Sequence, residues 1–174
     1  MSKEDLSQIT SYLSFRLGDE VFALHVGKVQ KILGMAEITE VPRAPRYMKG
    51  VINLRGNVLP VVDTRVKFGM TPTERTKTTS ILVIEANISG EFVMLGILVD
   101  AVQAVLKIEK EDLLPPPSIG KQYRSDIISN MARVKEKFYI ILNMDTVFSS
   151  DDQLNMNELM KAKEQINETT NQNQ

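Results

Sequence analysis

The sequence predicts an all-β protein, folded as a barrel or a sandwich. Between residues 12 and 142, about ten short apolar runs of strand length follow one another, and turn-forming residues separate them. Such regular spacing of short strands favours barrels and sandwiches over a parallel α/β sheet. The chain has 174 residues, of which 43% are hydrophobic, so it is long and apolar enough to bury a core.

The first predicted element is a β-hairpin. Apolar residues alternate with polar ones over 13–17, the turn Gly18-Asp19 follows, and a second apolar run covers 21–24. Over 26–33 the apolar residues recur at spacings of three and four, which predicts a short helix. Gly34 is expected to end that helix.

A second hairpin is predicted over 51–62, with its turn at Arg55-Gly56-Asn57. Gly56-Asn57 can take positive φ at little cost. Because Pro60 has no N–H to donate to a ladder, its strand should lie at an edge or bend there. After this strand, Asp63-Thr64 is typical of a helix cap and Gly69 of a helix end.

The second half of the chain is again rich in predicted strands. Residues 71–80 include five threonines and no apolar residue, and they mark the expected boundary between two subdomains, at 10–75 and 76–150. Residues 151–174 are expected to form a short helix and then a disordered polar tail. The strands and the short helix predicted between these segments cover 80–86, 92–99, 102–108, 127–134, 138–142 and 145–148.

Composition excludes several classes of function. Lys and Arg total 21 against 22 Asp and Glu, so the chain lacks the excess of positive charge that nucleic-acid binders show. It contains no Cys, which rules out disulfides, thiolate nucleophiles and Cys-bearing metal sites. The sequence shows neither a signal peptide nor an apolar run of membrane-spanning length, so we expect a cytoplasmic protein.

The sequence offers few candidates for catalysis. His25 lies at a strand end, and Asp63 and Asp100 each follow an apolar strand, so a paired-carboxylate site requires those two strand ends to converge. Structural roles such as helix capping and turn formation explain the three residues better. Phosphate-binding glycine loops and nucleophile elbows are absent from the sequence. We therefore expect no enzymatic activity, no bound metal and no cofactor.

Two features bear on a possible binding surface. Met94, Met131 and Met144 lie within or beside apolar strands, so we expect them to fill gaps in the core rather than to form an adaptable surface. Arg55 is hard to explain as part of a core, because it lies at a hairpin tip beside Gly56. Its guanidinium can bind a partner's carboxylate or carbonyl groups, and the alternative is a solvated turn charge.

Residues 38–63, which read ITEVPRAPRYMKGVINLRGNVLPVVD, resemble the signature region of the CheW family of chemotaxis coupling proteins. Residues 15–24 and 96–100 also resemble this family, so the resemblance covers roughly residues 10–150. It implies two interlocked five-stranded SH3-like β-barrels with a few short helices and a hydrophobic core between the barrels. Residues 10–150 would then form a single domain, with possible exchange of strands between its two barrels.

The resemblance also implies a function without catalysis. CheW-like proteins are adaptors that join the regulatory domain of the histidine kinase CheA to the cytoplasmic tips of methyl-accepting chemoreceptors, in membrane-associated arrays. Lys31 departs from the family, in which many members carry Glu at this position. The residues that the resemblance places in partner binding lie in three segments of the chain: Val29, Lys31, Gly50, Asn53, Arg55, Gly56, Val102 and Val105.

Two other functions remain open at this point. A CheW-like scaffold could serve another receptor–kinase pathway, such as surface motility. A general SH3-like protein-interaction module is the other alternative, although only 6% of the residues are aromatic and Trp is absent. We expect no nucleic-acid partner and no direct insertion into the membrane.

Overall fold

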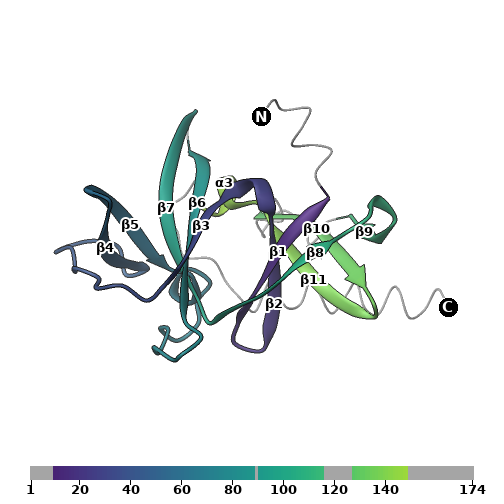
Figure 1. Ribbon diagram of the computed structural model, residues 1–174, viewed down its shortest axis with the longest axis horizontal. Coiled ribbons are helices and arrows are strands. Elements are labelled where there is room, and N and C mark those ends of the chain that lie inside the picture. The colour runs from purple at the N-terminus through teal and green to yellow at the C-terminus, as the bar shows by residue number, and fades with distance from the viewer. Residues whose placement is uncertain (1–9, 89, 116–126, 149–174) are drawn as a thin grey trace.

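The computed structural model describes residues 10–88, 90–115 and 127–148, and in this part of the chain it contains two curled β-sheets (Figure 1). The first sheet has the strand order β8 (Ala101–Lys107), β1 (Ser11–Leu17), β2 (Glu20–His25), β11 (Lys137–Leu142), β10 (Ile128–Val134), β9 (Leu113–Leu114). The second sheet has the order β3 (Val29–Gly34), β6 (Ser80–Ile88), β7 (Glu91–Val99), β5 (Asn57–Asp63), β4 (Met48–Leu54). Paired neighbours are antiparallel, except for β2 with β11 and β5 with β7.

The predicted all-β class is confirmed. The described residues form eleven strands where about ten were predicted, and the short β9 makes the first sheet six-stranded. Helical segments are brief: α2 (Thr64–Lys67), α3 (Met144–Val147) and the 3₁₀ turns η1 (Val26–Lys28) and η2 (Lys110–Asp112). The expected helix and polar tail at 151–174 lie outside the described residues.

The two sheets are interlocked because the chain passes between them twice. It leaves the first sheet after β2 and enters the second at β3, through η1, and it returns to the first sheet between β7 and β8, at Asp100. The threonine-rich segment at 71–80 therefore connects two strands of the same sheet. The strands β6 and β7, which follow residue 75, pair with β3 and β5, which precede it.

Period-two alternation along the strands builds the core. On the first sheet, Phe15 and Phe22 face the second sheet, whereas Ala23 and Tyr139 face the interior of the first. One buried cluster lies between the sheets and is called the central core here. Each curled sheet also encloses one smaller cluster. Ile108 belongs to the cluster of the first sheet, and Val61 belongs to the cluster of the second. The predicted hydrophobic core between two barrels is therefore present.

The helix predicted over 26–33 is wrong beyond its first turn. Only η1 is helical, and Val29–Gly34 form the strand β3, which pairs with β6. The register of this pair shifts between Val29 and Lys31, so Val29 packs on the central core whereas Leu33 packs inside the second sheet. A bulge inserts one extra residue into a strand, so the spacing between apolar residues changes from two to three at that point. A spacing of three is also typical of a helix.

Several local predictions need smaller corrections. The hairpin turn places Arg55 at φ 51 and Gly56 at φ 83, and Asn57 already begins β5. Met131 and Met144 are buried, but Met94 is 42% exposed, because alternation along β7 places it on the face opposite to Val93 and Leu95, which pack in the central core. The last short helix runs over Met144–Val147 instead of 145–148, since Asn143 caps it.

Two other local predictions agree with the structure. Asp63 caps α2 by accepting a hydrogen bond from the Arg65 amide, and Gly69 follows the helix at φ 78. Pro60 pairs with Val51 of β4, and β5 joins β7 only from Val61 onward, so on that side Pro60 lies at an edge.

Candidate functional site

The tip of the β4–β5 hairpin presents three of the candidate residues together. Arg55 is exposed at the turn, and its guanidinium forms no ion pair with any described residue. The Gly56 amide donates a 2.9 Å hydrogen bond to Oδ1 of Asn53, which holds the turn closed. Arg55 adopts φ 51 at this tip, a left-handed conformation that few non-glycine residues take. The tip is thus a fixed loop that carries one unneutralised guanidinium.

Gly50 lies at the base of this hairpin, and the structure gives it a packing role. It is buried at φ 152, and a Cβ atom there would collide with the Thr39 carbonyl. The Thr39 amide donates to the Val51 carbonyl at 2.9 Å, and the Val51 amide donates back at 2.8 Å. Gly50 therefore lets residue 39 pair with the outer edge of β4.

Val29 and Lys31 lie on β3, at the other edge of the same sheet. Val29 is partly buried and packs on the central core, whereas Lys31 is exposed opposite Val83 of β6. The second sheet thus carries Val29 and Lys31 on one edge strand, and Gly50, Asn53 and the Arg55 tip on the other.

Val102 and Val105 lie on β8, an edge strand of the first sheet. Val102 pairs with Phe15 and packs on the central core, and Val105 pairs with Leu13 and is 63% exposed. The candidates therefore lie on three strand edges, two in the second sheet and one in the first, and Val29 and Lys31 occupy the β3 edge. The other two edges present the exposed side chains considered below. One is the Arg55 tip of the second sheet, and the other is the apolar edge of the first.

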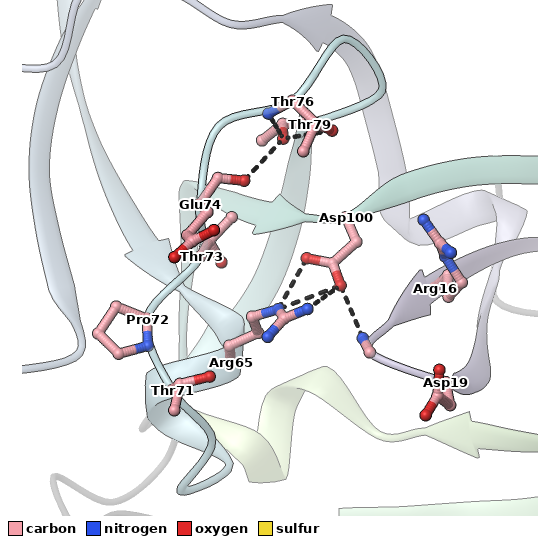
Figure 2. A pocket seen from close by; sticks show the side chains of 11 residues that line it. Arg16, Asp19, Arg65, Thr71, Pro72, Thr73, Glu74, Thr76, Thr79 and Asp100 are labelled. Carbon is pink, nitrogen blue, oxygen red and sulfur yellow. Dashed lines mark hydrogen bonds and ion pairs between the residues drawn. The ribbon is translucent and has the colours of Figure 1, made fainter.

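A polar cleft of ≈ 760 Å³ lies where the chain returns to the first sheet (Figure 2). In its centre, Arg65 and Asp100 face each other, with Arg65 Nη2 2.6 Å and Nε 2.8 Å from the Asp100 carboxylate oxygens. The Gly18 amide donates to the same carboxylate at 2.6 Å. Residues of the threonine-rich segment line one side of the cleft, and Arg16 and Asp19 line the other.

The Arg65–Asp100 pair is ionised. Burial alone would raise the pKa of Asp100, but the hydrogen bonds from Arg65 and Gly18 and the positive charge of Arg65 outweigh it and lower that pKa. The hydrogen bond to Asp100 raises the pKa of Arg65. Both groups are therefore ionised near neutral pH.

The ends of the strands that carry Asp63 and Asp100 do converge, since Asp63 pairs with Leu98 of β7. The two carboxylates are engaged separately, however. Asp63 accepts from the Arg65 amide and from both the amide and the hydroxyl of Thr73. Its neighbour Asp100 is bound to Arg65. These contacts are a helix cap for Asp63 and an ion pair for Asp100, in agreement with the structural roles predicted for both.

His25 also has a structural contact, because its Nδ1 accepts a 3.1 Å hydrogen bond from the Gly27 amide at η1. Within the described ranges, no group of three or more His, Cys, Asp or Glu side chains is placed to hold a metal ion. The helices found there are also too short or too polar to cross a membrane.

Sequence reasoning missed Arg65. Its position two residues after a predicted helix cap was the available signal, since it places the side chain in the first turn of α2, at the convergent strand ends. What the sequence could not provide was the neighbour, because Asp100 lies 35 residues away along the chain.

Comparisons with known proteins agree on one family. Residues 11–152 match the family model described as the CheW-like domain. The chain is 34% identical over 140 residues to the chemotaxis protein CheW of Rhizobium meliloti. The aligned residues cover 80% of this chain and 88% of that protein. It is 29% identical over 151 residues to the chemotaxis protein CheW of Klebsiella aerogenes, over 87% and 89% of the two chains. The crystal structure of the scaffolding protein TtCheW from Thermoanaerobacter tengcongensis superposes with a TM-score of 0.70 and 28% identity, over 82% of this chain and 90% of that one.

Proposed function

The chain belongs to the CheW-like domain family, and on that basis we propose that it couples chemoreceptors to the histidine kinase CheA. As a member of this family it is a chemotaxis adaptor and not an enzyme. The finer assignment is that one surface binds the regulatory domain of the kinase and another binds the cytoplasmic tips of methyl-accepting receptors. The protein then works in the cytoplasm, at membrane-associated receptor arrays.

The observation that supports this proposal is that exposed candidate residues lie on both of the interlocked sheets, at separate edges. Arg55 lies on an edge hairpin of the second sheet, and Val105 lies on an edge strand of the first. Such an arrangement leaves both surfaces accessible at the same time, which an adaptor requires. We also propose that residues 10–150 act as a single unit, because each sheet contains strands from both halves of the chain.

The Arg55 tip suits the kinase contact in its chemistry. A guanidinium can donate two parallel hydrogen bonds to a carboxylate or to backbone carbonyls, so it fixes orientation as well as contributing affinity. The tip is already ordered by the Asn53–Gly56 hydrogen bond and by the pairing of residue 39 with β4. Little conformational entropy is therefore lost when a partner binds there.

The β8 edge suits a helical receptor tip. Val105 is exposed, and Val102 beside it descends into the central core, so together they form an apolar row next to the junction of the sheets. An amphipathic helix binds by placing its apolar face on such a row. Val29 of β3 packs on the same central core, so it borders the junction from the second sheet.

A calorimetric titration tests the kinase contact. The wild-type chain and Arg55→Asp are titrated with the regulatory domain of a CheA-type kinase from the same organism. Lys135→Asp is the matched control, because Lys135 is also an exposed hairpin-turn cation at φ 51. We expect the wild type and the control to bind alike, and Arg55→Asp to bind at least about tenfold more weakly, since a charge-assisted contact becomes a repulsive one.

The possible outcomes separate the parts of the proposal. Equal binding by all three proteins supports the coupling role but removes Arg55 from the kinase contact. Absence of binding by the folded wild type contradicts the coupling role itself.

A further inference from the structure

We propose that a second, basic surface on the second sheet binds an acidic linear segment of a partner protein. This surface is a hollow of ≈ 300 Å³ formed largely by residues 40–49, and it is called the basic hollow here. Its rim carries Arg43, Arg46 and Lys49. The inference does not depend on the proposed function, because it concerns residues outside the Arg55 tip and the β8 edge.

The basic hollow is lined by apolar and by cationic side chains. Val41, Pro45 and Met48 are among the apolar residues that line it. Val41 is 40% exposed, so its side chain is accessible to a partner. Protein interfaces commonly have this composition, with an apolar centre that excludes water and a charged periphery. The hollow therefore fits a segment with one apolar side chain between acidic ones.

The charges of the rim are not neutralised within the described part of the chain. Lys28, Arg65 and Lys107 each form an ion pair there, whereas the three rim cations form none. Two carboxylates also line the hollow. Asp63 is already occupied by the Arg65 amide and by Thr73, and Glu40 alone faces three cations.

The backbone holds these cations in place. Two successive turns shape the segment: the Ala44 amide donates to the Val41 carbonyl, and the Met48 amide donates to the Pro45 carbonyl at 2.9 Å. Pro42 and Pro45 restrict φ in these turns. At the end of β5, the Asp63 amide donates to the Tyr47 carbonyl at 2.7 Å, which anchors the segment to the sheet. A preorganised loop loses little entropy on binding.

An acidic peptide suits this surface better than other anionic partners. Two guanidinium groups can each bind a carboxylate with paired hydrogen bonds, and the apolar residues of the lining can contact an apolar side chain. A flat anionic membrane would not enter a hollow of this kind. Nucleic acid normally requires a larger excess of positive charge than a chain of net charge −1 provides.

The test is a titration followed by ¹⁵N–¹H NMR. The probe is a short synthetic peptide with one central Leu flanked by Asp and Glu, and its control peptide carries Asn and Gln instead. We expect saturable shifts at the amides of 40–49 with the acidic peptide only, and weaker binding at higher salt. In the double variant Arg43→Glu with Arg46→Glu, binding should fall at least about tenfold, because two attractive contacts become repulsive.

The control variant is Lys135→Glu with Lys137→Glu, which changes the net charge equally on exposed residues of the first sheet. It should bind the acidic peptide like the wild type. The inference is overturned by equal weakening in both variants, by shifts that map away from 40–49, or by equal binding of the neutral peptide. It is also overturned if anionic lipid vesicles, but not the peptide, bind in a manner that requires Arg43 and Arg46.

Discussion

Asp100 lies at the single position between β7 and β8, where the chain passes from the second sheet into the first. Its carboxylate binds Arg65 of α2 and the amide of Gly18 in the β1–β2 turn, and its backbone carbonyl accepts from the hydroxyl of Thr78. The Asp100 amide donates to the Arg16 carbonyl at 3.0 Å. One residue thus connects four segments at the crossing.

The first prediction concerns this residue. Asp100→Asn should lower the free energy of unfolding by about 2 kcal/mol, because hydrogen bonds to a charged group are lost and Arg65 remains unneutralised. Urea denaturation measures the change. Lys107→Gln is the control, since the exposed Lys107–Glu109 pair should contribute less than about 1 kcal/mol. Equal losses in the two variants would contradict the structural role given to Asp100.

The second prediction concerns pH. The pKa of Asp100 in the folded protein lies below its ordinary value of 3.8. At a pH between the folded and the unfolded pKa of Asp100, the native state therefore binds fewer protons than the unfolded state. The contribution of Asp100 to stability is therefore complete above the unfolded pKa and disappears as pH falls through the folded pKa. In urea denaturation at a series of pH values, the difference between wild type and Asp100→Asn should shrink as the pH falls below about 4. A difference that stays constant over that range would show that ionisation is not its source.

At the scale of single elements, the sequence predicted most hairpins and caps, and its errors have physical causes. The β1–β2 and β4–β5 hairpins follow from alternation and turn residues, and α2 follows from the cap at Asp63. The strand β3 was mistaken for a helix because its bulge changes the apolar period. Bulges depend on pairing with a distant strand, in this case β6, so the local pattern did not reveal this one.

The edge strand β8 provides the third prediction, which rests on the proposed function. Val105→Glu should weaken binding of a receptor tip by about tenfold, since it places a charge in the apolar row, and should leave kinase binding unchanged. Phe92→Glu is the control, because Phe92 is an exposed apolar residue at the start of β7 in the second sheet, at 69% exposure against 63% for Val105. Calorimetry with a receptor-tip fragment and with the kinase domain gives both values. Loss of both interactions in a folded Val105→Glu protein would contradict two separate surfaces.

At the scale of the whole molecule, the sequence alone predicted the fold class but not the sheet neighbours. Alternation shows that a strand has two faces, but it does not show that β2 pairs with β11 or that β5 pairs with β7. The resemblance to a known family supplied the two-barrel arrangement. The Arg65–Asp100 contact depends on these distant pairings, so it became visible only in the structure.

The central claim is that one molecule of this chain bridges two partners. The most direct measurement is cosedimentation of the kinase regulatory domain with receptor-bearing vesicles, in the presence and absence of the chain. We expect the kinase domain to sediment only when the chain is present. With Arg55→Asp, we expect the chain still to sediment while the kinase domain stays in solution. Sedimentation of the kinase domain without the chain, or competition between kinase and receptor for the chain, would contradict the claim.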